Sequence, residues 1–305
     1  MSDDSHSRFY LRGRPGDLDS ELTWKKVVRY GRRAEILATD WLTGTGTVRI
    51  SFKVADEQPF SFAPGQWIGL EEEVPDVGPR RSSYCIYSPP TDDGRFELLL
   101  RVLPDGPLSK HLVTLGVGYQ VRFRGPMGRS MLPRDSDTDL VLVATGVGLA
   151  PLYSLLGHLR EAGESRPIRL YWGLRLADDI CLRHELDQLA ADLANFSYQI
   201  SLSEPPDDWP ELRGRVTESV PPLIDRLRGK RFYLSGNGAM IEEMELALCT
   251  LGVDRTSISE ERFFNLKHHP ARATMDAIMA RFVADDIVPA DANLRTRVWR
   301  VTEPD

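Results

Sequence analysis

Hydrophobic positions follow two different patterns along this chain. From Ala34 to about residue 135, short apolar stretches alternate with polar residues. The clearest example places Val48, Ile50, Phe52 and Val54 on one face, as in a strand that buries one side. Further short strands, each bounded by Gly, Pro or Asp, are expected at 68–70, 83–88, 96–102 and 119–123. Short strands separated by turns predict an antiparallel β-barrel.

After the polar segment 133–138, continuous apolar stretches alternate with segments of helical spacing. We expect strands at 140–145, 168–173, 197–202 and 231–235, and helices at 151–162, 182–194, 218–228 and 239–250. This alternation predicts a parallel sheet with crossover helices, so the fold class is a two-domain β plus α/β protein. The expected organisation is an N-terminal extension (1–33), a β-barrel domain (34–135), an α/β domain (136–264) and a C-terminal extension (265–305) with one helix at Pro270–Ala284.

The segment Asp139–Leu156 carries the clearest local signal. An apolar strand ends at Thr145-Gly-Val-Gly148, and a helical pattern begins at Pro151, a residue favoured at the first helical position. A strand, a glycine turn and a helix bring backbone amides and a positive helix end to a phosphate. The alternative is an ordinary βα turn. The pattern is not the dinucleotide fingerprint G-x-G-x-x-G, because Pro151 stands where the third glycine would be.

Composition argues against several classes of protein. The net charge of −7 disfavours nucleic acid as the main partner. The chain has no apolar run of about 18 residues, and its polar N-terminus lacks a signal-peptide core. Cys85, Cys181 and Cys249 are too scattered for a disulfide framework, an iron–sulfur cluster or a local metal site. We therefore expect a cytoplasmic protein without a bound metal.

A basic stretch precedes the first strand. Trp24–Arg33 contains five basic residues and no acidic one, namely Lys25, Lys26, Arg29, Arg32 and Arg33. It is either a solvated charged face or a docking patch for an acidic protein.

Six motifs in order support a more specific interpretation. They are Phe62–Gln66, Arg81–Ile86, Asp105–Ser109, Gly125–Gly128, Thr145–Pro151 and Ser235–Met240. Together, over about residues 34 to 264, they resemble the ferredoxin–NADP reductase family. The resemblance implies an FAD-binding β-barrel followed by an NAD(P)-binding α/β domain, with electrons passing between NAD(P)H and a one-electron carrier such as ferredoxin or flavodoxin.

The resemblance also implies roles for individual residues. Arg81 would bind the flavin pyrophosphate, Tyr84 would stack on the isoalloxazine ring, and the glycine turns would hold the dinucleotides. The expected catalytic residues are Ser83, Tyr84, Cys85 and Ser235. The expected cofactor-binding residues are Arg81, Ser83, Tyr84, Cys85, Ile86, Leu100, Arg101, Val102, Gly106, Pro107, Leu108, Ser109, Thr145, Gly146, Gly148, Arg175, Ser203, Gly236, Asn237 and Met240.

Two departures from the family pattern leave questions open. Relatives usually have Arg-x-Tyr-Ser at the flavin, whereas this chain has Arg81-Ser-Ser-Tyr-Cys85. Counted from Arg81, Tyr and Ser are exchanged; counted from Tyr84, Cys85 replaces the Ser and one residue is inserted. Ser235 stands where many relatives have a Cys beside the nicotinamide.

The choice between NADH and NADPH is open, with a slight preference for NADH. Arg175 suits a 2′-phosphate, but Glu204, which follows Ser203, would repel one and accept from ribose hydroxyls instead. Two alternative functions also stay open. They are reduction of a small acceptor such as free flavin or a ferric chelate, and a non-catalytic subunit that keeps the fold.

Overall fold

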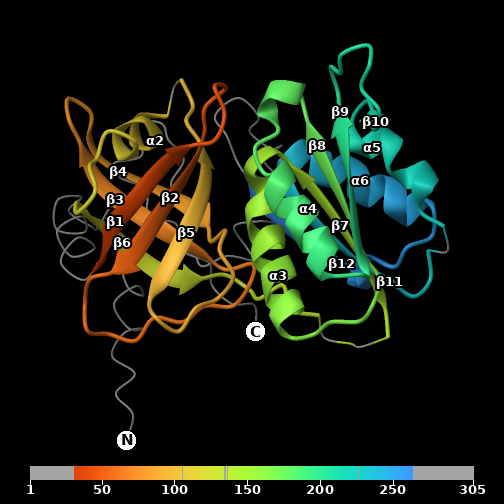
Figure 1. Ribbon diagram of the computed structural model, residues 1–305, viewed down its shortest axis with the longest axis horizontal. Helices are drawn as coiled ribbons and strands as arrows, with labels where there is room; N and C mark the ends of the chain where they lie inside the picture. Colours follow the sequence, from red (N-terminus) through yellow and green to blue (C-terminus); the bar gives the residue numbers. More distant parts are fainter. Residues whose placement is uncertain (1–30, 105, 134, 136, 226, 264–305) are drawn as a thin grey trace, which may run out of the picture.

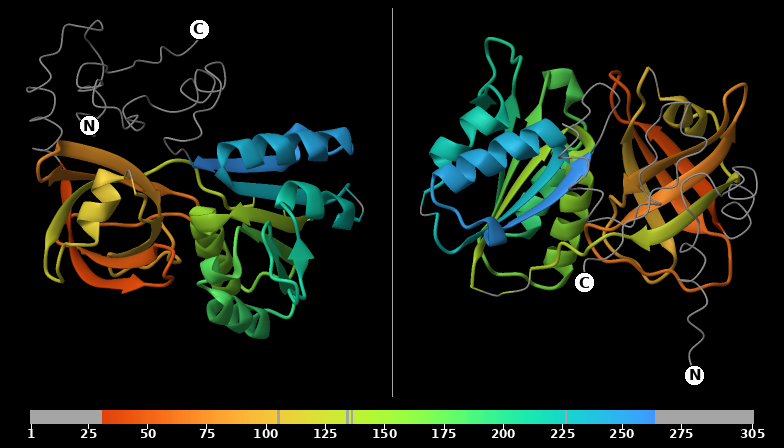
Figure 2. Two further views of the ribbon diagram at one scale, coloured as in Figure 1. Left: turned by 90° about the horizontal axis from the view of Figure 1, so that it is seen from above. Right: turned by 180° about the vertical axis from the view of Figure 1, so that it is seen from behind.

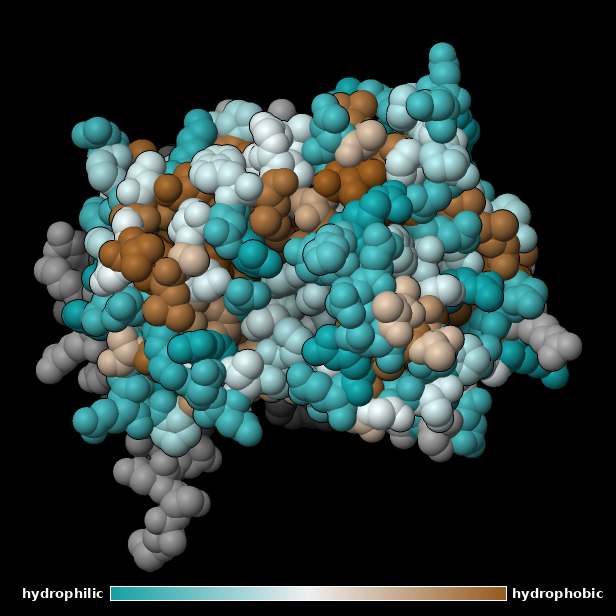
Figure 3. All heavy atoms as spheres, in the orientation of Figure 1, coloured by the Kyte–Doolittle hydropathy of each residue, from teal (hydrophilic) through white to brown (hydrophobic). Residues whose placement is uncertain are grey.

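The chain forms two domains that lie side by side (Figure 1). The computed structural model describes residues 31–104, 106–133, 135, 137–225 and 227–263. The expected C-terminal helix at 270–284 therefore lies outside the described residues. No helix within these ranges is long and apolar enough to cross a membrane. On the face seen in Figure 3, polar side chains cover most of the α/β domain.

The first domain is an antiparallel sheet that curls into a barrel. Its strands are β1 (Arg32–Trp41), β2 (Thr47–Val54), β3 (Trp67–Val74), β4 (Gly78–Cys85), β5 (Arg95–Arg101) and β6 (Gln120–Met127). The strand order is β4-β3-β6-β1-β2-β5, so β4 and β5 are the two edges, and a bridge between Ile86 and Leu98 joins them. The short helix α2 (Pro107–Leu112) lies against β3 and β4. Phe52, Phe96 and Phe123 fill the barrel core.

The second domain is a parallel sheet with helices on both faces (Figure 2). The strands, in the order β10-β9-β8-β7-β11-β12, are β7 (Asp139–Thr145), β8 (Ile168–Leu174), β9 (Phe196–Leu202), β10 (Leu212–Arg213), β11 (Lys230–Asn237) and β12 (Ile258–Phe263). The α-helices are α3 (Leu149–Glu161), α4 (Arg183–Asp192), α5 (Val216–Ser219) and α6 (Gly238–Thr250). Single 3-10 turns are η2 (Gly146–Gly148), η3 (Ala177–Asp179), η4 (Pro221–Leu223) and η5 (Arg255–Ser257).

One hydrophobic cluster crosses the seam between the domains. It joins Trp67, Tyr87 and Leu99 of the barrel to the apolar side of α3 and the sheet beneath it. The rings of Tyr87 and Tyr153 stack with centroids 4.5 Å apart. Beside them the buried Ser154 hydroxyl donates a 2.7 Å hydrogen bond to the Ser88 carbonyl. The seam is therefore packed as a core rather than as a loose contact.

The structure confirms the predicted fold class and corrects several elements. The helix expected at 218–228 is wrong, because only α5 and η4 form there. Pro221 and Pro222 lack the amide donors that a continuing helix needs. The strand expected at 83–88 begins earlier, at Gly78, and ends at Cys85. Sequence patterns missed β12, whose run Ser-Glu-Glu-Arg hides a partly buried strand.

Gly157→Ala tests how tightly the seam is packed. A Cβ on Gly157 would lie 2.2 Å from Cγ of Pro89 in the other domain, and a proline ring cannot swing away. Alanine is normally better in a helix by about 1 kcal/mol. We nevertheless expect the variant to lose about 1–3 kcal/mol of unfolding free energy through overpacking, measured by urea denaturation. Gly116→Ala, in open space, is the control. A variant as stable as the wild type would contradict a close-packed seam.

Candidate functional site

The carboxyl ends of β7, β11 and β12 meet the barrel at the seam. In parallel α/β sheets this end of the strands is where ligands bind. The turn η2 follows β7 directly and contacts β5 of the barrel. This edge of the sheet therefore combines strand ends, a glycine turn and the wall of the barrel.

Two glycine turns pack against each other at this edge. A Cβ on Gly148 would lie 2.5 Å from the Ser235 carbonyl oxygen, and one on Gly236 would lie 2.2 Å from Thr145 Oγ1. Gly236 also has φ of +141°, in a region that favours glycine. Thr145 Oγ1 accepts from the Asn237 amide at 3.3 Å, and the Gly146 carbonyl accepts from Trp172 Nε1 at 3.0 Å. The two predicted turns therefore form one cradle of bare backbone.

Ser235 contributes a buried polar group beneath this cradle. Its side chain is fully buried, and its hydroxyl has no hydrogen-bond partner among the described residues. A buried hydroxyl without a partner costs about 1–3 kcal/mol, so such a group indicates a ligand site. The two other predicted residues here have local roles as well. The Asn237 side chain caps α6 by accepting from the Ala239 amide at 2.8 Å, and Met240 packs in the core under α6.

On the barrel side, Tyr84 and Cys85 point to opposite faces of β4. Tyr84 packs with the barrel core beside the bridge from Ile86 to Leu98, which joins the edge strands β4 and β5. Burial raises the pKa of its phenol to about 12. Cys85 belongs to the cluster that crosses the seam, and Ser83 is exposed. One strand therefore supplies an aromatic ring to the barrel side and a thiol to the seam.

Arg81 lies in a buried group of charges. Its Nε is 2.9 Å from Oε1 of Glu71, and Nε of Arg124 is 2.8 Å from the same oxygen. The Glu71 side chain is fully buried, so both guanidinium groups compensate its charge. The sequence motif alone did not show that Arg81 has this structural partner.

A second turn of the barrel is tightly closed. Leu100 and Arg101 end β5, and Val102 follows on the way to Gly106, after which α2 begins at Pro107. The Ser109 hydroxyl donates to the Gly106 carbonyl at 3.1 Å, and a Cβ on Gly106 would lie 2.7 Å from Ser109 Oγ. Leu108 packs in the barrel core and holds the turn in place.

Glu261 is a site residue that the sequence analysis missed. It lies on β12, and its carboxyl group is enclosed at the seam, where it is hydrogen-bonded to the Cys85 thiol, although the residue as a whole is partly accessible. Burial, and then the charge of Glu260, raise the pKa of Glu261 to about 8. Burial also raises the pKa of Cys85. The seam therefore holds a thiol and a carboxyl that both keep their protons at neutral pH. The charged sequence of β12 gave no sign of a parallel strand, so the position of Glu261 could not be predicted.

Arg175 and Glu204 form an exposed pair at the carboxyl ends of β8 and β9. The Arg175 Nε lies 2.8 Å from Glu204 Oε1. The Glu204 amide donates to the Arg175 carbonyl at 2.9 Å, and the Ser203 amide donates to the Leu174 carbonyl at 3.0 Å. The backbone therefore aligns the two loops and keeps the two charges together.

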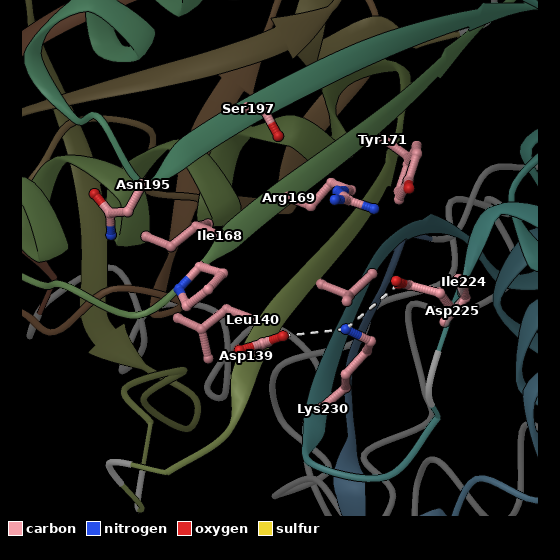
Figure 4. A pocket seen from close by; sticks show the side chains of 12 residues that line it. Asp139, Leu140, Ile168, Arg169, Tyr171, Asn195, Ser197, Ile224, Asp225 and Lys230 are labelled. Atoms are coloured by element: carbon pink, nitrogen blue, oxygen red, sulfur yellow. Dashed lines mark hydrogen bonds and ion pairs between the residues drawn. The ribbon is translucent and has the colours of Figure 1, made fainter.

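A separate cavity of about 140 Å³ lies at the opposite, amino ends of the strands (Figure 4). Lys230 in its wall is 3.1 Å from Asp139 and 3.9 Å from Asp225, so carboxylates already compensate its charge. This cavity is far along the strands from the glycine turns, and we do not assign it to the candidate site.

The raised pKa of Glu261 makes stability depend on pH. In the folded protein the carboxyl keeps its proton up to about pH 8, whereas its ordinary pKa is 4.5. Between these values the folded state binds more protons, so the unfolding free energy falls as pH rises. Glu261→Gln, which cannot ionise, should gain stability relative to the wild type by at least about 1 kcal/mol between pH 5 and pH 8. Chemical denaturation at both pH values measures this, with exposed Glu218→Gln as control. A difference that does not change with pH would show that Glu261 is ionised in the folded protein.

Comparisons with known proteins agree with this geometry. Residues 38–131 match the model of an oxidoreductase FAD-binding domain, and residues 142–245 match that of an oxidoreductase NAD-binding domain. A ferredoxin–NADP reductase B of Sorangium cellulosum is 33% identical over 221 residues, which cover 70% of this chain and 90% of the relative. The reductase component of naphthalene 1,2-dioxygenase/salicylate 5-hydroxylase systems from Ralstonia is 32% identical over 71% of this chain. The match spans only 64% of the length of that relative.

Solved structures show the same two-domain fold. The cytochrome P450 reductase GcoB from Amycolatopsis has a TM-score of 0.69 and 27% identity, with coverage of 76% of this chain and 69% of that one. A ferredoxin NADP⁺ reductase from Neisseria gonorrhoeae has a TM-score of 0.65 at 20% identity, with coverage of 76% and 98%. With its paired domain matches and its Sorangium relative, the chain belongs to the ferredoxin–NADP reductase family, as its six motifs predicted.

Proposed function

We propose that this protein is an FAD-dependent oxidoreductase that passes electrons between NAD(P)H and a separate one-electron carrier such as ferredoxin or flavodoxin. One observation carries the proposal. The end of β4 in the barrel and β12, the strand that pairs with β11 beside Gly236, belong to different domains and meet at one buried seam through Cys85 and Glu261. When bound there, FAD supplies the ability to accept a hydride and to release electrons singly.

The residues present fit both nucleotides. On the barrel, Tyr84 supplies an aromatic ring on the edge strand β4, and the tight turn Gly106–Ser109 suits a diphosphate. On the sheet, Gly148 and Gly236 leave backbone where any side chain would collide. The hydroxyl of Ser235, without a partner among the described residues, supplies a donor for a ligand at the same edge.

Two kinds of group at the seam would act on the bound nucleotides: apolar side chains that exclude water, and polar side chains that hold protons. The cluster around Trp67 and Tyr87 excludes water, which strengthens polar interactions inside the site. The Glu261 carboxyl group accepts from the Cys85 thiol, and its raised pKa keeps a proton at the seam at neutral pH. This favours the motif register that counts from Tyr84, in which Cys85 takes the place of the serine of relatives. Arg81, whose Nε lies 2.9 Å from Glu71, is the cation that we propose for the diphosphate.

We propose a separate carrier on the basis of the relatives, and the cysteines of this sequence agree with it. Iron–sulfur clusters are held mostly by four cysteine thiolates, and this sequence has three cysteines, all free thiols. Of the predicted basic docking patch, Lys25, Lys26 and Arg29 lie outside the described residues. Arg32 is a structural residue, 2.7 Å from Asp56 and over the rings of Phe60 and Phe123. Arg33 is exposed and remains a candidate contact for an acidic carrier.

Domain limits and location complete the proposal. We place the FAD-binding domain at 34–135 and the NAD(P)-binding domain at 136–264, with β1 beginning two residues earlier, at Arg32, and β12 ending at Phe263. The free thiols also favour the reducing conditions of the cytoplasm.

Anaerobic stopped-flow mixing with NADH and with NADPH tests the proposed function. We expect purified protein to show flavin absorption, the nucleotide to bleach it, and a ferredoxin or flavodoxin to restore it. Direct reduction of ferric chelates, without a protein carrier, is the comparison reaction. Protein that lacks flavin bands and binds no FAD on reconstitution would refute the proposal, and rates higher with chelates than with any carrier would favour a small acceptor.

Glu204→Gln tests the nucleotide preference. In the wild type Glu204 accepts a hydrogen bond from the guanidinium of Arg175 and adds a negative charge where a 2′-phosphate would lie. We therefore propose that NADH is preferred. Because the pair is exposed it is weak, and removal of the charge frees Arg175 for the phosphate. We expect kcat/KM for NADPH relative to NADH to rise about tenfold, which corresponds to about 1.4 kcal/mol. Asp208→Asn, nearby and exposed, is the control. An unchanged ratio would exclude Glu204 as the determinant.

A further inference from the structure

The carboxylate of Asp179 joins the two domains at a point away from α3. Asp179 ends η3 in the α/β domain, and it is buried. Its Oδ1 accepts from the Thr45 hydroxyl at 2.7 Å and from Arg101 Nη1 at 3.0 Å, and both of these residues belong to the barrel. Its Oδ2 accepts from the Leu176 amide at 3.2 Å. The carboxylate therefore connects three segments that are distant in the sequence.

Each of these segments is fixed on its own side of the seam. Thr45 lies in the turn between β1 and β2, and its hydroxyl is 2.9 Å from that of Thr43, which accepts from the Thr47 amide at 3.0 Å. The Val102 amide donates to the Gly46 carbonyl at 2.8 Å, so this turn is also tied to the end of β5. A displacement of Asp179 would therefore move the turn and the end of β5 together.

Arg101 is the last residue of β5, a barrel strand that contacts the glycine turn η2 of the α/β domain. Its side chain is 37% exposed, and its contact with the nearly buried Asp179 is a charge-assisted hydrogen bond. Other seam contacts come from α3, at Tyr153 and Ser154, from β12, where Glu261 meets Cys85, and from α4, where Glu185 lies 3.8 Å from Arg49. Asp179 adds a contact from η3, and contacts from several elements resist pivoting of one domain on the other.

We propose that Asp179 is a positioning residue for hydride transfer: through Arg101 and Thr45 it sets the spacing between the flavin cradle of the barrel and the nicotinamide cradle of the sheet. This inference rests on the proposed function. Transfer requires reacting atoms about 3–3.5 Å apart, and a displacement of about 1 Å can cost about 100-fold in rate. Asp179 therefore affects the rate of the step although it touches neither reacting atom.

The test measures flavin reduction in FAD-loaded variants by stopped flow, with separate rate constants at saturation and dissociation constants for NADH. Asp179→Ala removes all three contacts. Asp178→Ala, the adjacent exposed carboxylate of η3, is the matched control. We expect Asp179→Ala to slow the saturated rate about 30-fold, with less than about a threefold change in the dissociation constant for NADH. Asp179→Asn keeps one oxygen, which can still accept from Thr45 and Arg101, whereas its NH2 group cannot accept from the Leu176 amide, so this variant should lose less than Asp179→Ala.

A second measurement does not depend on activity. Hydrogen–deuterium exchange should become faster in Asp179→Ala at residues 42–47 and 175–180, and should stay unchanged at 151–158 on α3. If Asp179→Ala fails to retain FAD, Thr45→Val replaces it in the test, because it removes only the Thr45 contact with Asp179. We expect this variant to slow flavin reduction by NADH about three- to tenfold. In a double-mutant cycle, the losses of Asp179→Ala and Arg101→Ala should not multiply, because both act through one contact.

The outcomes separate this inference from the proposed function. If NADH and NADPH do not reduce the wild-type flavin, the proposed function fails. If the wild type is reduced and Asp179→Ala is equally fast, or if Asp178→Ala is equally slow, the role of Asp179 is refuted. Losses that multiply in the double mutant would also refute it, because Arg101 and Asp179 would then act independently.

Discussion

The packing of the barrel against α3 and the parallel sheet is the interaction on which the rest of the site depends. Trp67, Tyr87 and Leu99 enter the same apolar cluster as the helix that follows the glycine turn. This cluster holds the open edge of the barrel against the carboxyl ends of β7, β11 and β12. Neither cradle alone places a flavin beside a nicotinamide, and the dry seam between them supplies that geometry.

The same burial explains the unusual polar groups at the seam. A carboxyl that is shielded from water favours its protonated form, so Glu261 holds a proton at neutral pH. Ser235 is buried without a partner among the described residues, and this costs stability that a bound ligand can return. Glu71 is tolerated in full burial because Arg81 and Arg124 both lie within 3 Å of one of its oxygens. Function and stability are therefore in tension along this surface.

The alternation of β4 gives one strand two tasks. Successive side chains of a strand point to opposite faces, so Tyr84 lies on the barrel side and Cys85 on the seam side. The apparent irregularity of the motif Arg81–Ile86 then has a simple physical meaning. Because Tyr84 and Cys85 are adjacent in the strand, the ring serves the barrel side and the thiol serves the seam. Arg81, three residues before Tyr84, is paired with the buried Glu71.

The sequence by itself determined the two domains, the glycine turns at Gly146–Gly148 and Gly236, and the family, because periodicity and turn residues are local properties of the chain. It did not show β12, since the charged run Ser-Glu-Glu-Arg lacks the apolar pattern of a parallel strand. It also left the partners of Arg81, Glu261 and Asp179 undetermined. Those contacts join residues that are distant in the chain, and only the tertiary structure brings their charges together and removes the water between them.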